Sequence, residues 1–234
     1  MVEPKEDRKY ERLKKLGQEL HVPIPELFLA LEVRDKKGRP IQGHCKRCHS
    51  FGRNVYNYIL SSLFAKNCPD STFEAGKLSM KVTSGTVRYG SYGAGIIAQT
   101  NFESNGPTAG AGVDTHGILV GSGVAAESFE DYALQTLIPN GTTAGKLSYV
   151  ASEAPVYSYD APTKNWTAEF KRYFNNNSGA DITVNEVALV YYLERVAGTA
   201  DRVLWSRDRL ASGVTVPNTG QLRVTYTLQI TYPA

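Results

Sequence analysis

Hydrophobic and polar residues alternate along residues 145–234 with the period of two that is typical of β-strands. In the last segment, Leu222, Val224 and Tyr226 share one face, and Arg223 and Thr225 share the other. Val, Thr and Tyr, which strand surfaces favour, are frequent throughout. We therefore predict strands at KLSYVA, PVYSY, NWTAEFKRYF, DITVNEVALVYYLE, RVLWSRDRL and QLRVTYTLQITYP. The segment NNNSGAD, residues 175–181, is predicted to join two of them as a hairpin loop.

Three earlier segments also have strand character. Residues 27–42 are predicted to form a strand, a turn at Asp35–Gly38 and a second strand. The segment KLSMKVTSGTVRYG indicates strands on either side of a Ser-Gly turn. GILVGSG, residues 117–123, indicates a short buried strand that runs into a glycine turn. The surrounding stretches are rich in Gly, Ser, Thr and Ala, and we expect them to be loops.

Two segments have helical spacing instead. Residues 4–20 place Leu13, Leu16 and Leu20 at i, i+3 and i+7, with charged residues between them. This stripe is narrow for a core helix, so we predict an arm that packs on a neighbouring molecule through these three leucines, with the proline-containing HVPIPEL as its hinge. A second helix is predicted near 50–65, with Ser50 as its N-cap. Its apolar face would contain Phe51, Val55, Tyr58, Ile59 and Leu63.

Together these elements predict an all-β fold, an antiparallel jelly-roll-like sandwich with one embedded amphipathic helix and an N-terminal helical arm. We place the arm and its hinge at residues 1–24 and the β-sandwich domain at 25–234. Strands and helices do not alternate along the chain, which argues against a doubly wound sheet.

Length and charge restrict the partners. The 234 residues contain no apolar run of the length that spans a membrane, so we expect no membrane partner. Residues 1–53 carry a net charge of +5 and the remainder −2. We interpret the basic end as a solvated helix and turn and expect no nucleic-acid partner, although such an end could touch nucleic acid or an acidic protein face. The N-terminal sequence lacks the apolar region of a secretory signal, so we expect synthesis in a cytoplasm.

The segment HCKRCH contains C-x-x-C-H, the attachment pattern of c-type haem. In that interpretation Cys45 and Cys48 would bind the haem and His49 would ligate the iron. A zinc site made of His44, Cys45, Cys48 and His49 is a second alternative, although structural zinc sites usually take a second ligand pair from another segment. With Cys68 the chain has three cysteines, which argues against a disulfide framework. We favour a free-thiol turn between a hairpin and a helix, with no cofactor.

Other candidate residues lack a catalytic motif. His116 lies near Asp114, but no G-x-S-x-G or phosphate-binding loop is present, so we expect His116 to hydrogen-bond its own turn. Two charged stretches are interpreted as surface or interface ion pairs, and four aromatic residues could form a sugar-binding platform or contribute to core or subunit contacts. The charged stretches hold Glu130, Asp131, Arg207, Asp208 and Arg209, and the aromatic residues are Trp166, Tyr191, Tyr192 and Trp205. We expect a protein that is not an enzyme.

Several segments resemble a group of virion proteins from tailed bacteriophages: LEVRDKKGRPI, SFGRNVYNYI, DTHGILVGSG, FEDYALQTLI and the C-terminal LWSRDRLASGVTVPNTGQLRVTYTLQITYP. The resemblance covers roughly residues 27–65 and 112–234. It implies a β-sandwich structural subunit of the tail, neck or capsid surface, present in many symmetric copies and contacting other virion proteins. A carbohydrate-binding or adhesion module at a tail tip, with a host glycan as partner, is the alternative. Electron transfer through haem c is the third hypothesis.

Overall fold

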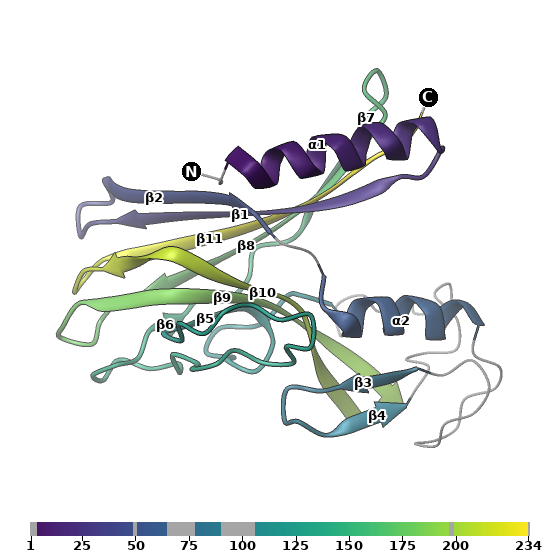
Figure 1. Ribbon diagram of the computed structural model, residues 1–234. Helices are drawn as coiled ribbons and strands as arrows, with labels where there is room; N and C mark the ends of the chain where they lie inside the picture. The colour runs from purple at the N-terminus through teal and green to yellow at the C-terminus, as the bar shows by residue number, and fades with distance from the viewer. Residues whose placement is uncertain (1–3, 49–50, 65–77, 90–105, 197–198, 234) are drawn as a thin grey trace.

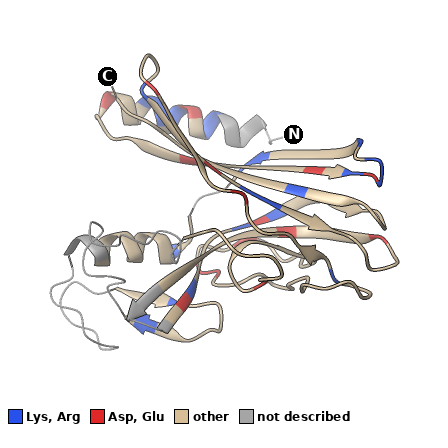
Figure 2. Ribbon diagram, turned by 180° about the vertical axis from the view of Figure 1, so that it is seen from behind, with Lys and Arg blue, Asp and Glu red and all other residues tan. Residues whose placement is uncertain are grey.

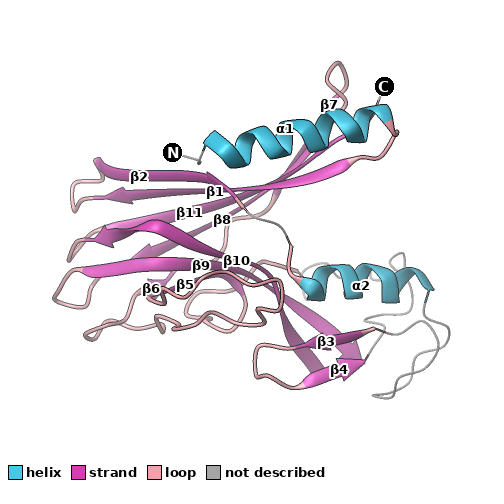
Figure 3. Ribbon diagram, in the orientation of Figure 1, coloured by secondary structure: helices cyan, strands magenta, loops and turns pink. Residues whose placement is uncertain are grey.

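The computed structural model describes residues 4–48, 51–64, 78–89, 106–196 and 199–233. These residues form mainly β-structure, and the pairs between named strands are antiparallel, as the alternation predicts (Figure 3). In chain order the elements are α1 (Pro4–Glu19), β1 (Ile24–Arg34), β2 (Pro40–Arg47), α2 (Arg53–Phe64), β3 (Ser79–Lys81), β4 (Val87–Tyr89), β5 (Gly117–Gly121), β6 (Ser148–Tyr149), β7 (Val156–Asp160), β8 (Asn165–Asn175), β9 (Ile182–Val196), β10 (Thr199–Val216) and β11 (Gln221–Thr231).

The larger sheet has the order β2-β1-β11-β8, and both β6 and β7 pair with the remaining edge of β8. Its register places Leu29 opposite Tyr226 and Leu31 opposite Val224. All four of these side chains are buried. The alternation seen in the sequence therefore marks the side of this sheet that faces the core, as it does in a sheet with one covered face.

The smaller sheet has the order β10-β9-β5 and faces the larger one across a shared core (Figure 1). Leu189 of β9 and Val214 of β10 belong to the same buried cluster as Leu29 of β1 and Phe174 of β8. β5 is buried along its whole length, as its apolar sequence predicts. The core thus lies between two antiparallel sheets.

The loop at 175–181 is a correction to the predicted hairpin. It leaves β8 in the larger sheet and enters β9 in the smaller one, and these two strands do not pair. Asn176 is buried there and donates hydrogen bonds from Nδ2 to the carbonyls of Ala180 and Val216, both at 2.8 Å. Turn residues are common to hairpins and to crossovers between sheets, so only the strand partners distinguish the two.

The two other predicted strand–turn–strand units, around Gly38 and Gly85, are confirmed. Gly38 and Gly85 have φ values of 76° and 86° at the turns, a backbone region that glycine adopts without steric cost. The second strand of the first hairpin, β2, continues to Arg47. Cys45 therefore lies within a strand. The prediction that the cysteine motif forms only the connection between a hairpin and a helix is corrected in this respect.

The predicted helix near 50–65 is confirmed as α2, which packs on β3 and β10 (Figure 1). Its docking contacts are polar: Asn54, Asn57 and Ser61 hydrogen-bond the backbone of Lys81, Ser79 and Leu78, respectively. Val55 is buried as predicted, but Ile59 is 44% exposed. The side chain of Leu63 and the proposed N-cap Ser50 lie outside the described residues.

Candidate functional site

The two cysteines of the C-x-x-C-H segment are not brought together. Cys45 pairs with Ala30 within the antiparallel ladder of β1 and β2 and is exposed. Cys48, three residues on, is buried, and its amide hydrogen-bonds the carbonyl of Leu27. Positions three apart along an extended chain point to opposite faces, because side chains alternate at every residue.

This arrangement provides no common site for the two thiols to bind one haem or one metal ion. Burial raises the pKa of Cys48 well above its usual value, and the charge of Asp208 raises it further. A thiol held in its protonated form is a poor ligand and a poor nucleophile. His44 lies on β2, and its Nε2 is buried without a hydrogen-bond partner. His49 and Cys68 lie outside the described residues.

The outer side of β2 borders a shallow groove of about 550 Å³. Cys45, Glu32 and Arg223 line it, and Arg223 forms an ion pair with Glu32 at 2.7 Å. The groove is thus a polar surface depression whose charged side chains already have partners.

On the inner side, Lys46 of β2 reaches a buried carboxylate of the other sheet. Its Nζ lies 3.3 Å from Oδ1 of Asp208 on β10, and it donates hydrogen bonds to Glu127 Oε1 at 2.8 Å and to the Arg209 carbonyl at 3.1 Å. The three side chains are 11%, 0% and 17% exposed for Lys46, Asp208 and Glu127. Burial lowers the pKa of Lys46, but the charge of Asp208 and the hydrogen bond to Glu127 outweigh burial, so its pKa is raised.

The two oxygens of Asp208 have different surroundings. Oδ2 accepts hydrogen bonds from Ser206 Oγ and Tyr226 Oη, both at 2.8 Å. Oδ1 is buried and accepts no hydrogen bond. Burial, and after it the charge of Asp208, raises the pKa of Tyr226 well above its usual range, so this phenol remains a proton donor. Lys46, Glu127 and Asp208 thus form one group at the seam between β2 and β10, in which Asp208 is fully buried and the other two side chains are largely buried.

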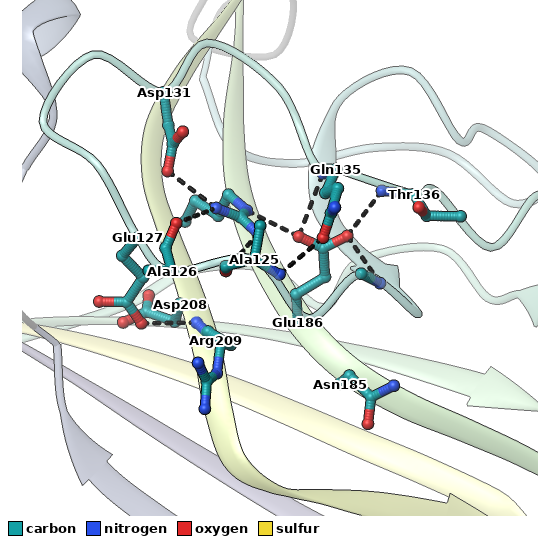
Figure 4. A network of polar contacts seen from close by, with 12 residues as sticks. Ala125, Ala126, Glu127, Asp131, Gln135, Thr136, Asn185, Glu186, Asp208 and Arg209 are labelled. Carbon is teal, nitrogen blue, oxygen red and sulfur yellow. Dashed lines mark hydrogen bonds and ion pairs between the residues drawn. The ribbon is translucent and has the colours of Figure 1, made fainter.

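A second buried network joins Arg207 and Glu186 (Figure 4). Glu186 of β9 accepts backbone hydrogen bonds from Gly123, Gln135 and Thr136, and its Oε2 lies 2.6 Å from Nε of Arg207. Arg207 also donates to Asp131 Oδ2 at 2.9 Å and to the carbonyls of residues 125 and 126. The pair holds the loop at 122–136 against β9 and β10.

Of the predicted surface or interface ion pairs, the surface alternative is wrong for Arg207 and Asp208, which are 8% and 0% exposed. Both lie on β10 beside elements that cover them. Glu130 is the exception, because it forms an exposed pair with Arg53 at 3.2 Å. No sequence motif marks Glu186, whose backbone partners come from a loop that lies 50 to 63 residues earlier in the chain.

Arg172 is the largest side chain that is fully buried in the described residues, and carbonyls surround it. Its guanidinium donates to the carbonyls of Gly110, Val113, His116, Ile118 and Val150 at 2.7–3.3 Å. It also lies over the ring of Tyr149. Arg172 belongs to β8 of the larger sheet and Ile118 to β5 of the smaller sheet, so Arg172 provides a second polar connection between the two sheets.

His116 and Asp114 do not form a pair. His116 Nδ1 shares a hydrogen bond with Thr115 of its own turn at 3.2 Å, as predicted, and its ring packs on Tyr192. Burial, with the nearby charges of Arg202 and Arg172, lowers the pKa of His116 to about 4. Asp114 instead accepts a hydrogen bond from the Asn140 amide at 2.9 Å.

The predicted N-terminal helix, α1, lies along the outer face of the larger sheet (Figure 1). Polar residues attach it: Lys14 Nζ lies 3.1 Å from Glu26 on β1, and Tyr10 Oη donates to the Cys48 carbonyl at 3.3 Å. Arg47 forms an ion pair with the same Glu26 and stacks over the Tyr10 ring. We call the set Tyr10, Lys14, Glu26 and Arg47 the polar latch.

The latch leaves Leu13 and Leu16 of α1, and Leu20 just after its end, uncovered on an adjoining side of the helix. Leu13, Leu16 and Leu20 are 43%, 49% and 62% exposed. Gly17 is buried, and a Cβ at this position would lie 2.7 Å from the Ile24 side chain, so only glycine permits this close approach. Beyond its grey first turn, α1 carries Lys and Arg positions interspersed with acidic ones, and Lys and Arg positions also mark the turn between β1 and β2 (Figure 2).

The four aromatic residues do not form one platform. Tyr191 and Trp205 stack at 3.5 Å between the sheet and α2, and Tyr192 packs on His116. Trp166 stacks instead on Tyr157 of β7, with ring centroids 6.2 Å apart. Tyr157 and the nearby Tyr159 are 61% and 58% exposed, so the exposed aromatic surface lies on β7, where sequence reasoning had not placed it.

No described helix is long and apolar enough to cross a membrane. Within the described ranges, no three His, Cys, Asp or Glu side chains gather in a way that could hold a metal ion. Comparison of the chain with protein-family models, with curated proteins and with solved structures found no match.

Proposed function

We propose that this protein is a non-enzymatic structural subunit that assembles with copies of itself, and that it serves in the virion of a tailed bacteriophage, at the tail, neck or capsid surface. The resemblance of residues 27–65 and 112–234 to such proteins suggests the setting, with synthesis in the host cytoplasm. Two antiparallel sheets joined by a crossover at 175–181 are compatible with the jelly-roll-like arrangement that we propose for the fold.

The observation that carries the proposal is the orientation of α1. A helix docked on its own sheet would normally turn its apolar side inward. Here Tyr10, Lys14 and Gly17 face the sheet, while Leu13, Leu16 and Leu20 lie roughly a quarter-turn away around the helix axis and remain exposed. Exposed apolar residues grouped on one face are typical of an interaction surface. The occupant that we propose is a neighbouring copy of the chain, with other virion proteins at the ends of the assembly.

The internal polar networks support a structural role. The buried groups around Arg207 and Arg172 are engaged with backbone atoms, which fixes loops against the sheets. Such satisfied networks make a rigid building block.

The test is the oligomeric state in solution. The double variant Leu13→Glu, Leu16→Glu is compared with Val124→Glu, which changes a 64% exposed residue on the loop over β9 and β10. Light scattering should show oligomers for the wild type and for Val124→Glu and monomers for the double variant. Equal masses for all three proteins would contradict the proposal.

A carbohydrate-binding module at a tail tip is a second candidate, because Tyr157 and Tyr159 of β7 are exposed beside the partly buried Trp166 of β8. Aromatic faces of this kind stack on sugar rings. Specific binding on a glycan array that Tyr157→Ala removes would support this alternative. The absence of binding would count against it and leave the assembly proposal intact.

A further inference from the structure

The group at Lys46, Glu127 and Asp208 has the composition of a reaction site. An amine and a carboxyl group lie 3.3 Å apart between Nζ and Oδ1, and a second carboxylate is hydrogen-bonded to the same amine at 2.8 Å. The pair bridges two strands that do not hydrogen-bond to each other in a ladder, because β2 is an edge of the larger sheet and β10 an edge of the smaller one.

The hydrogen bonds to Asp208 are asymmetric in a way that suits attack on its carboxyl carbon. Ser206 and Tyr226 hold Oδ2 with two donors, whereas Oδ1 accepts no hydrogen bond and lies beside Lys46. Donors fixed on one oxygen stabilise the negative charge that develops on that oxygen when a nucleophile adds to the carbon. The other oxygen is left available to depart.

We propose that Lys46 and Asp208 become joined by an intramolecular isopeptide bond, with Glu127 as the proton carrier. The bond would connect Nζ of Lys46 to Cγ of Asp208 and release one water molecule. The reaction occurs once in each chain and leaves no free enzyme activity, so it is separate from the proposed assembly function.

Starting from the ammonium and carboxylate forms, one proton passes from Nζ through Glu127 to Oδ1 of Asp208, which leaves a neutral amine and a neutral acid; the second proton follows the same route after addition. The amine then adds to Cγ, and Ser206 and Tyr226 stabilise the charge on Oδ2. The C–Oδ1 bond breaks, and Oδ1 leaves as water after taking both protons that Nζ has lost. One hydrogen remains on the amide nitrogen, and nothing is oxidised or reduced.

Burial favours this chemistry. Removing water disfavours the charged form of Lys46, which brings its neutral amine closer in free energy. It also protects the product from hydrolysis. The fixed position of the two groups replaces a bimolecular encounter by a unimolecular step. The neighbouring carboxylates keep the pKa of Lys46 raised, so the reactive neutral form is a minority and the bond should form slowly after folding.

The bond would act as a covalent staple across the seam. It would connect β2, near the start of the β-sandwich, to β10, near its end. A cross-link between residues far apart in the chain restricts the unfolded state, as a disulfide does. Unlike a disulfide, an amide bond is not broken by reducing agents.

The experiment is intact-mass spectrometry of the full-length protein, followed by proteolytic mapping. We expect a mass one water molecule below that of the sequence, once N-terminal processing is taken into account, and a branched peptide that joins Lys46 to Asp208. The mass deficit should grow with time after refolding. A mass equal to that of the sequence after prolonged incubation, or a link mapped to other residues, would overturn the proposal.

Substitutions of Lys46, Asp208 and Glu127 test the role that each residue has in forming the bond. Lys46→Arg and Asp208→Ala should show no mass deficit, and Glu127→Gln should slow its appearance. Asp208→Asn should give the same product by releasing ammonia in place of water. Lys171→Arg is the matched control, because Lys171 lies 3.0 Å and 3.3 Å from two carboxylates that are exposed. This variant should keep the full deficit, and its loss there would contradict the assignment. The wild-type mass decides the question even where a variant fails to fold.

Discussion

Nε of Arg207 lies 2.6 Å from Oε2 of Glu186 in the buried interface between the smaller sheet and the loop at 122–136. Both side chains are nearly inaccessible to solvent, and each also binds backbone groups of the loop. The pair therefore connects two strands to a segment without regular secondary structure, and its loss would affect both.

Replacing Arg207 by Met should reduce the free energy of unfolding by about 3–5 kcal/mol, because Glu186 would stay buried without its charge partner. Urea denaturation measures the loss. Arg209→Met is the matched control on the same strand, since the Arg209 side chain is exposed, and it should change stability by less than about 0.5 kcal/mol. Similar losses in the two variants would show that the Arg207 pair has no special role.

The stability of the protein should fall as the pH drops from 6.5 towards 4, in part because of His116. Its pKa is about 4 in the folded protein, below the usual value of 6.5, because burial, Arg202 and Arg172 disfavour the charged ring. As the pH falls, the unfolded chain therefore binds a proton before the folded protein does. The stability that the neutral His116 contributes above pH 6.5 is lost between pH 6.5 and 4. Solvent screening of this half-buried group limits the loss to on the order of 1 kcal/mol.

Urea denaturation at pH 7 and pH 5 tests the role of His116. The variant His116→Gln should lose less stability between these two pH values than the wild type does. The control His21→Asn, at an exposed position, should behave as the wild type. A wild-type pH dependence that His116→Gln preserves in full would assign the effect to other groups.

Cys45 and Cys48 should differ in reactivity. Iodoacetamide should label the exposed Cys45 in the native protein, whereas Cys48 should react only after denaturation, because it is buried and its pKa is raised. Peptide mapping of the labelled protein distinguishes the two sites. Rapid native labelling of Cys48, or a Soret band in the visible spectrum of the purified protein, would contradict the placement of the two thiols on opposite faces of the chain.

Deletion of residues 1–22 should leave a β-sandwich domain that folds but assembles poorly. The deletion removes the three exposed leucines and half of the polar latch, while Glu26 keeps Arg47 as its partner. Thermal unfolding and incorporation into particles are measured on the same preparation. A truncated protein that melts and assembles as the full chain does would exclude a role for α1. Failure to fold would place α1 within the structural core.

Much of the local structure followed from the sequence. The alternation in β11, the turns at Gly38 and Gly85 and the helical spacing of α2 predicted elements that the structure contains. These signals work because a period of two or of 3.6 residues records, within a few residues, which side of an element avoids water. The leucine stripe of α1 was visible for the same reason.

The direction in which that stripe points depended on the tertiary structure. Glu26 and Arg47 lie outside α1, and they attract Lys14 and Tyr10 to the sheet, so the helix docks by its polar side. The crossover at 175–181 and the opposite faces of Cys45 and Cys48 likewise depend on which strands pair.

The candidate reaction site at Lys46, Glu127 and Asp208 was likewise not predicted from the sequence. Lys46 follows a cysteine in a segment that suggested haem or zinc. Asp208 lies in a stretch interpreted as a surface or interface ion pair, and Glu127 belongs to a loop without a motif. Sequence alone determined which segments are strands and helices, since that information is local. Only the packing of two sheets brought an amine and two carboxylates from distant segments together at one seam, because burial and pairing are properties of the assembled fold.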